Sequence, residues 1–439
     1  MKETSTRAER LLAGIFLGTV LFFMCSIFCV IAVRHTSFLR QSDNLNDAAL
    51  SPQKQDILPV NWPELYPFSE EQSVPTAKVS KKFEEIYSYI QDKVTLYTTT
   101  DFLVYRPAIL FAKQCEELIG WNLASMTEYN GVVKLHDGYF TTFIEKRNVS
   151  ESAQSTVELA KFCEENGIDF LYVNAPYKVC KIEDADISGT LDFSNQNADE
   201  FLRQLKNAGI NYYDLREALH KENMSHHGAF YRADLHWRAE TGLWAARHIL
   251  QLLRDRVSYP VDPAVLEADI FTSILYPSWF LGSQGKKITL ARTKPDDFVL
   301  LYPKYPTLLH YQFAFSNIDV TGDFSVTYDM SQVQTMDYYN RNPYHAYNHG
   351  PNTVVKSRNM ILENDIKLVL IHDSFAYCVM PFLALGIEKI DALDLRHFNG
   401  SVHSCISSMK PDIVIVLYNP EWIGEPIDWQ SHTSLFDFR

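Results

Sequence analysis

Residues 366–375 read IKLVLIHDSF, an apolar run that ends in a short polar motif. A nearly continuous apolar run of this length is typical of a β-strand buried on both faces of a parallel sheet. Ser374 follows the run, where the strand turns into a helix predicted over residues 375–382, so its hydroxyl and backbone N–H would face the open end of the sheet. Taken alone, Asp373 and Ser374 fit an ordinary helix cap better than a catalytic site.

A second motif, Asp234-Leu235-His236-Trp237, lies far upstream of the serine. A carboxylate near Nδ1 of the histidine can fix the tautomer of the neutral ring and stabilise the imidazolium that forms when Nε2 takes a serine proton. Alone, this motif also fits a surface loop in front of a helix that begins near Ala239. Together, the two motifs predict the halves of one hydrolase-type active site.

The pattern of elements from residue 132 onward is that of an α/β domain. We predict helices at 152–166, 197–208 and 239–254, and strands at 168–174, 210–213, 368–371 and 413–417. Strands that alternate with helices at this spacing favour parallel pairing. Residues 257–355 are instead rich in Tyr, Pro, Thr and Asp, and short runs at 298–302 and 324–328 indicate β-ribbons. We interpret this region as an insertion that separates the base from the nucleophile and covers the cleft.

The N-terminal region contains one predicted membrane span. Residues 11–33 read LLAGIFLGTVLFFMCSIFCVIAV and carry no charge. At ~1.5 Å per residue, a helix of this length crosses a hydrocarbon core of about 30 Å. The run exceeds the apolar part of a signal peptide and ends without an Ala-x-Ala-like site, so we predict an uncleaved signal anchor in the cell membrane. Basic residues flank both sides, and we place the short N-terminus in the cytoplasm and the catalytic domain outside.

The rest of the chain divides by composition. A polar, Pro-punctuated stretch after the span reads as a stalk, and a helical pattern follows it. The predicted order is a cytoplasmic tail (1–10), a transmembrane anchor (11–33), a stalk (34–78), a helical region (79–130) and the catalytic domain (131–439, with the β-rich insertion at about 257–355).

Overall composition excludes several classes of protein. With 439 residues, of which 46% are hydrophobic, the chain can bury at least one large core. It has 54 acidic and 40 basic side chains, a net charge of −14 and no basic cluster, which argues against a nucleic-acid partner. No CxxC pair occurs among the seven cysteines, so we predict no metal site and expect mainly buried free thiols, with one or two disulfide bridges at most.

The segments around both motifs resemble a known family. Residues 231–237 and the helix after them are similar to the Asp-x-His-Trp segment of bacterial SGNH-like proteins, specifically the DHHW group related to the alginate O-acetyltransferases. The other similar segments are 372–375, 380–382 and 394–400 in the nucleophile region, 280–283 and 301–305 in the middle of the domain, and 134–139 near its start. The resemblance covers roughly residues 130–420.

This resemblance implies a three-layer α/β/α domain with a parallel sheet. In it, Ser374 is the nucleophile, His236 the base and Asp234 the residue that orients the base. It also implies an O-acyltransferase, specifically an O-acetyltransferase, that modifies a cell-envelope polysaccharide through an acyl-serine intermediate. No cofactor is expected, and the acyl group would come from a membrane partner that exports it. Two alternatives stay open: a carbohydrate esterase with the same triad, and a non-catalytic glycan-binding or envelope-assembly protein.

Several further residues are candidates for the oxyanion hole or for substrate contacts. Asn348 and Gly350 lie in a loop upstream of the serine strand, where a glycine lets the backbone approach the substrate, although an ordinary turn fits equally well. Arg396 could bind a sugar hydroxyl or carboxylate, or form a salt bridge with Asp394. The other two candidates are Asp373, next to the nucleophile, and Trp237, which could stack on a sugar or be buried in the core.

Overall fold

The computed structural model describes residues 131–439, apart from residues 136, 291, 315–316, 399 and 428–433. The predicted tail, membrane anchor, stalk and helical region therefore lie outside the described residues. Within the described ranges, no helix is both long enough and apolar enough to cross a membrane. The cysteines in these ranges, Cys163, Cys180, Cys378 and Cys405, are free.

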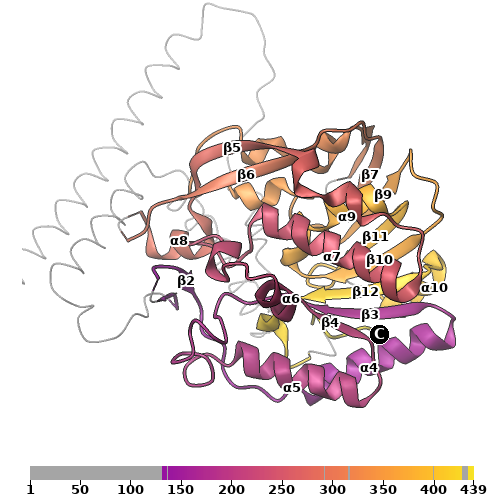
Figure 1. Ribbon diagram of the computed structural model, residues 1–439, viewed down its shortest axis with the longest axis horizontal. Helices are drawn as coiled ribbons and strands as arrows, with labels where there is room; N and C mark the ends of the chain where they lie inside the picture. Colours follow the sequence, from indigo (N-terminus) through magenta and orange to yellow (C-terminus); the bar gives the residue numbers. More distant parts are fainter. Residues whose placement is uncertain (1–130, 136, 291, 315–316, 399, 428–433) are drawn as a thin grey trace, which may run out of the picture. The chain divides into compact units, whose positions relative to one another are not determined.

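An eight-stranded mixed sheet forms the centre of the domain (Figure 1). Its strands are, in spatial order, β4 (Tyr212–Asp214), β3 (Asp169–Asn174), β12 (Ile413–Tyr418), β10 (Lys367–His372), β11 (Lys389–Asp394), β9 (Val354–Asn359), β7 (Leu309–Phe313) and β8 (Ile318–Gly322). The strands from β4 to β11 are parallel, whereas β9, β7 and β8 each run antiparallel to the neighbour before them. The carboxyl ends of the parallel strands therefore meet at one edge.

The mixed sheet corrects the prediction of a parallel one. Strands β7 and β8 come from the region interpreted as an insertion, yet they extend the central sheet. In β7, buried and half-buried positions alternate, as is usual for an antiparallel strand with one face on the core. The other strands of that region, β5 (Phe271–Phe280) and β6 (Asp296–Pro303), form a separate two-stranded antiparallel ribbon.

One stretch predicted as ribbon is helical. Residues 324–327 form the 3₁₀ helix η6 (Phe324–Thr327), because the side chain of Asp323 accepts a hydrogen bond from the Ser325 N–H and caps the turn. A capping aspartate just before a short apolar run is therefore a stronger local signal than the β-propensity of that run.

Helices cover both faces of the central sheet (Figure 1). Helices α4 (Ser150–Glu165), α5 (Ser194–Asn207) and α10 (Val402–Met409) contribute to one apolar core, and α7 (Ala239–Val257) and α9 (Met380–Gly386) to the other. Strand β10 separates the two cores: Leu368 and Leu370 join the α7 side, whereas Val369 and Ile371 join the α4 side. A strand between two cores must be apolar at successive positions, which explains the nearly continuous apolar run at residues 366–371.

Short elements complete the part of the domain that holds the site. They are β1 (Val133–Lys134), β2 (Phe140–Thr141), α6 (Leu215–Lys221), α8 (Gly282–Ile288), and the 3₁₀ helices η8 (Pro343–Ala346), η9 (Ser374–Cys378) and η10 (Pro420–Trp422).

Candidate active site

Ser374 lies at the carboxyl edge of the parallel strands, directly after β10. It is the first residue of η9, and the carboxylate of Asp373 caps this turn by accepting a hydrogen bond from the Phe375 N–H at 2.8 Å. The helix predicted over residues 375–382 is divided, because α9 begins at Met380 with Pro381 in its first turn, where a proline is tolerated. Ser374, the predicted nucleophile, thus sits on a tight, capped turn.

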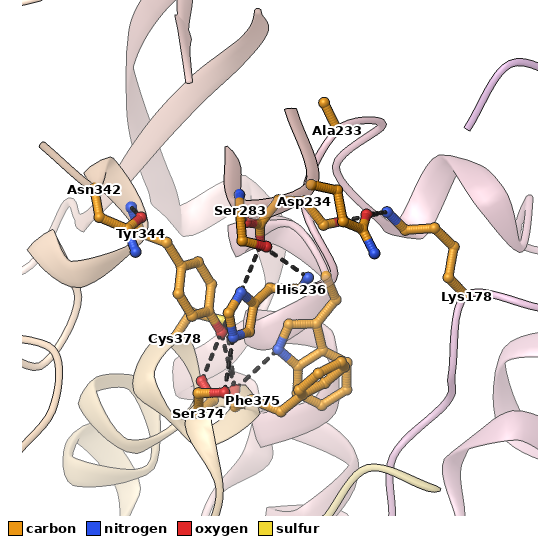
Figure 2. A network of polar contacts seen from close by, with 12 residues as sticks. Lys178, Ala233, Asp234, His236, Ser283, Asn342, Tyr344, Ser374, Phe375 and Cys378 are labelled. Carbon is orange, nitrogen blue, oxygen red and sulfur yellow. Dashed lines mark hydrogen bonds and ion pairs between the residues drawn. The ribbon is translucent and has the colours of Figure 1, made fainter. Parts of the chain in front are cut away.

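The structure brings together the three residues predicted as a triad (Figure 2). Ser374 Oγ lies 2.8 Å from His236 Nε2, and His236 Nδ1 lies 2.5 Å from Asp234 Oδ1. With Nδ1–H donating to the carboxylate, Nε2 is free to accept the serine proton. This is the geometry of a nucleophile, a general base and the carboxylate that orients the base.

Asp234 is held as a carboxylate by groups on both of its oxygens. Oδ1 also accepts from the backbone N–H of His236 at 3.0 Å, and Oδ2 accepts from the backbone N–H of Ser283 at 2.6 Å. Burial by itself would raise the pKa of Asp234, but the charge and hydrogen bonds of His236 and the Ser283 N–H hold this pKa below its ordinary value. Asp234 therefore remains an acceptor for the ring N–H.

The contact from Ser283 depends on a close approach by the start of α8. Gly282 has a φ of +74°, and a Cβ at this position would lie 2.4 Å from the carbonyl oxygen of Ala233. A glycine is needed here both for its backbone conformation and for the space. Sequence reasoning found the resemblance of residues 280–283 to a family segment, but the role of the Ser283 N–H was missed because a backbone donor leaves no side-chain signature.

Two aromatic residues fix the base and the nucleophile turn. The Tyr344 ring stacks on the His236 ring with centroids 4.0 Å apart, and its hydroxyl donates to the Ser374 carbonyl oxygen at 3.0 Å. Trp237 is fully buried and donates its indole N–H to the Phe375 carbonyl oxygen at 2.9 Å. Trp237 therefore belongs to the core, the second of the two roles considered for it, and is not available to stack on a sugar.

Arg396 reaches Ser374 from a position two residues beyond the end of β11. Its Nη1 lies 3.5 Å from Ser374 Oγ, while its Nε and Nη2 donate to the carboxylate of Asp394 at 2.9 and 2.6 Å. Burial would raise the pKa of Asp394, but the hydrogen bonds and charge of Arg396 lower it. The predicted salt bridge is thus present and leaves Nη1 beside Ser374, whereas the contact with a sugar stays a prediction. Arg396 also lines a cavity of about 220 Å³ with Trp422.

The remaining candidates have other positions. The Asp373 carboxylate is fully buried, and besides capping η9 it accepts from the backbone and side-chain N–H groups of Asn419 at 2.8 and 2.7 Å. Asn348 is 1% exposed, and neither polar atom of its amide has a hydrogen-bond partner among the described residues. Gly350, with a φ of +63°, packs on the ring of His345. Among the residues that the structure describes, no hydrogen bond joins Asn348 or Gly350 to Ser374.

Comparison with known proteins identifies the domain. Residues 137–265 match the family model described as "SGNH hydrolase-like domain, acetyltransferase AlgX", a range that contains Asp234 and His236 and ends before Ser374. Over these residues the chain is similar to the SGNH hydrolase-like domain of the AlgX type. None of the curated proteins compared with the chain matches it.

Solved structures resemble this SGNH-like domain beyond the matched range. PatB1 of Bacillus cereus, determined with a sulfonyl adduct, is similar at a TM-score of 0.57 and 16% identity, over 70% of this chain and 98% of that chain. A DHHW family protein from Eubacterium siraeum is similar at a TM-score of 0.49 and 17% identity, over 68% of this chain and 94% of the other. The likeness to PatB1 concerns the fold. Together with the family match, it confirms the predicted SGNH-like domain and, at the level of the family, an SGNH-like enzyme.

Proposed function

We propose that this SGNH-like domain is an O-acetyltransferase that modifies a cell-envelope polysaccharide through an acyl-serine intermediate. The observation that carries the proposal is the 2.8 Å contact between Ser374 Oγ and His236 Nε2, with Asp234 on the other ring nitrogen. The family model, which is described as an acetyltransferase, supports the identity of the transferred group. Residues 11–33 are proposed to anchor the protein in the cell membrane with the domain outside, where a membrane partner supplies the acyl group.

The first half-reaction loads the serine. Ser374 Oγ attacks the carbonyl carbon of the acyl donor while its proton passes to His236 Nε2, and Asp234 stabilises the imidazolium. The leaving group departs with that proton, and Ser374 becomes an ester. The Phe375 N–H is already bound to Asp373, so the backbone N–H of Ser374 and the Arg396 guanidinium are the donors proposed to stabilise the negative charge that develops on the carbonyl oxygen.

The second half-reaction transfers the acyl group. A glycan hydroxyl gives its proton to His236 Nε2 and attacks the acyl carbon, the bond to Ser374 Oγ breaks, and the serine regains its proton. The cavity of about 220 Å³ lined by Arg396 and Trp422 offers room for part of an acceptor, and Arg396 connects it to Ser374 because no triad residue lines the cavity itself. An acceptor that extends from this cavity past Arg396 over the acyl-serine would exclude water from it, which favours transfer over hydrolysis.

The direct test uses the full-length protein with an acetyl-ester reporter, with and without a cell-envelope glycan. Because PatB1 was determined with a sulfonyl adduct, a sulfonyl fluoride is a suitable covalent probe for Ser374. We expect rapid-quench mass spectrometry to find one acetyl group on the peptide that contains Ser374, and the glycan to take it up. Acetate release unchanged by glycan, with no glycan ester formed, would favour the esterase instead.

Replacing the nucleophile gives the first mutational prediction. Ser374→Ala is expected to lower kcat by ~10³-fold or more, because no acyl-serine can form. The matched control is Ser407→Ala, which makes the same change at an exposed position on α10. Turnover of the reporter at the wild-type rate by Ser374→Ala would refute the assignment of the nucleophile.

A further inference from the structure

Lys178 is a fully buried lysine that lies shortly after β3, close to the triad. Figure 2 shows its side chain reaching toward Asp234. In sequence it looks like any other lysine, and its position in the core requires an explanation, since burying an ammonium group is costly unless hydrogen bonds and charges compensate.

The ammonium group of Lys178 has an acceptor for each of its three N–H bonds. It donates to the carbonyl oxygen of Phe140 at 2.7 Å, to the side-chain oxygen of Gln284 at 3.2 Å and, in a short hydrogen bond, to the carbonyl oxygen of Asp234. The carbonyl oxygen of Arg232, at 3.4 Å, is a fourth and more distant acceptor. An ammonium has three donors and no acceptor, so it matches this set of oxygens. The three partners belong to β2, to α8 and to the loop that carries the base.

Charge around Lys178 partly offsets its burial. Burial lowers the pKa of Lys178 to about 7, while the carboxylates of Asp234, Asp296 and Asp137 act in the opposite direction. A methionine or leucine would fill the same space without these costs. The hydrogen bonds to the Asp234 loop are what an apolar side chain could not supply.

Asp234 is therefore fixed at two points. Its carboxylate is held by the N–H groups of Ser283 and His236, and its main chain is held by Lys178. Gln284, which follows Ser283 in α8, also binds Lys178, so the same ammonium links both supports of the carboxylate. Without it, the carbonyl oxygens of Phe140 and Asp234 would lose their shared charged donor, and the loop could shift relative to α8.

We propose that Lys178 is a positioning residue that holds the main chain of Asp234, and thereby keeps the Asp234 carboxylate on Nδ1 of His236. It acts through Asp234 and does not contact the substrate. The kinetic part of this inference rests on the proposed acyl-transfer function, whereas the geometric part does not. Reporter kinetics test the kinetic part, and proton NMR without substrate tests the geometric part.

The first experiment replaces Lys178 with methionine in the full-length protein, which keeps the length of the side chain and removes its donors and charge. Misplacing a catalytic group by ~1 Å can cost about 100-fold in rate, so we expect kcat for the acetyl-ester reporter to fall by that order while KM changes little. The matched control, Lys181→Met, removes an exposed lysine that pairs with Asp199 and is expected to leave kcat unchanged. Wild-type kcat in a folded Lys178→Met protein would overturn the inference.

A second readout needs no substrate. The Nδ1 proton shared by His236 and Asp234 should give a low-field resonance in the proton NMR spectrum of the wild type, which Asp234→Asn would identify. We expect this resonance to weaken or move upfield in Lys178→Met. If it persists unchanged, Lys178 does not position the pair, whether or not the protein transfers acyl groups. A wild type that turns over no acyl ester would refute the proposed function alone.

Chemical rescue distinguishes hydrogen bonding from space filling. In Lys178→Ala, propylammonium should enter the vacated space and restore part of kcat in a dose-dependent way. Tetramethylammonium, which has the same charge and no N–H donor, should not. Equal recovery with both cations would overturn the role of the donors.

If Lys178→Met and Lys178→Ala fail to fold, the kinetic and NMR readouts are applied to Lys178→Gln, which is neutral and keeps two N–H donors. Wild-type kcat and a wild-type NMR resonance in that variant would refute the need for an ammonium at this position.

Discussion

Arg396 combines a structural and a chemical contact in one side chain. It neutralises the buried Asp394 and also reaches Ser374 Oγ. An internal parallel helps to separate these roles, because β4 and β11 both end in an aspartate that is followed by Leu-Arg. Arg216 binds Asp214 two residues before it at 2.7 Å, as Arg396 binds Asp394, but among the described residues its hydrogen bonds go to Asp214, Asp199 and Asn195 and not to the triad.

We predict that Arg396→Met destabilises the protein by ~3–5 kcal/mol, because it leaves the carboxylate of Asp394 buried without its partner. Adding Asp394→Asn should restore most of the free energy of unfolding, measured in urea, but not kcat, because the guanidinium beside Ser374 is still missing. The pair Arg216→Met and Asp214→Asn is the control for stability alone. Full recovery of kcat in the Arg396→Met, Asp394→Asn protein would show that the arginine is purely structural.

Among the elements, α8 has a larger role than its length suggests, since its first residues support Asp234. We predict that Gly282→Ala lowers both stability and kcat, because its Cβ would displace the Ser283 N–H from the carboxylate. Backbone strain of this kind costs ~1–3 kcal/mol by itself. Gly209 has nearly the same φ, +75°, with no atom within 4 Å of an added Cβ, so Gly209→Ala measures the strain without the clash.

The comparison of these two variants isolates the close approach of α8. Both the melting temperature and kcat for the reporter should fall further in Gly282→Ala than in Gly209→Ala. Equal losses of stability with unchanged kcat in Gly282→Ala would mean that the Ser283 N–H does not support the base.

Elements with a strong local pattern were predictable from the sequence. Strand β10 and helix α7 lie where the apolar runs and helical periodicity place them, within a few residues. The sequence motifs also paired the right side chains, since Asp234, His236 and Ser374 lie within hydrogen-bond distance of one another in the structure. Their supports were not predictable: the Ser283 N–H is a backbone group, and Lys178 is distinguished only by burial, which arises from contacts between distant segments.

At the scale of the whole domain, a histidine joins three segments that are far apart in sequence. His227 binds Asp184 at 2.9 Å through Nε2, forms a short ion pair with Asp137 through Nδ1, and lies 3.6 Å from Glu183. Burial opposes its charge, but the hydrogen bond with Asp184 and the charges of the three carboxylates raise the pKa of His227 above its ordinary value.

This arrangement predicts a pH dependence of stability. A raised pKa in the folded state means that the contribution of His227 is fully present below the unfolded pKa, near 6.5, and is lost as the pH rises through the folded pKa. We therefore expect the difference in melting temperature between the wild type and His227→Gln to be larger at pH 6 than at pH 8.

The control is His310→Gln, which removes a more exposed histidine paired with Asp319 on β7 and β8. Its effect on melting temperature should be small at both pH values, because exposed ion pairs contribute little. A difference for His227→Gln that is the same at both pH values, or larger at pH 8, would contradict the assignment of charge to His227.

The sheet as a whole was predicted in part. Its parallel half follows from regular alternation of strands and helices, but β7 and β8 lie in the region 257–355, whose composition resembles a separate insertion, and β9 begins at its end. Strands β7 and β8 could pair only with each other or extend the central sheet. Which occurs depends on β9, which pairs with β7 on one side and with β11 on the other, and local composition does not encode these contacts.

The position of β12 has a consequence for how the domain reaches its native state. It follows every other described strand in the sequence, yet it lies between β3 and β10. While the chain is being made, β3 and β10 must therefore leave a gap until residues 413–418 arrive. Pairings that join such distant segments form slowly, and the unpaired strand edges are prone to aggregation in the meantime. Ser374 and His236 are thus synthesised before β12 can complete the sheet that positions Ser374. We therefore expect the active site to be completed late in folding.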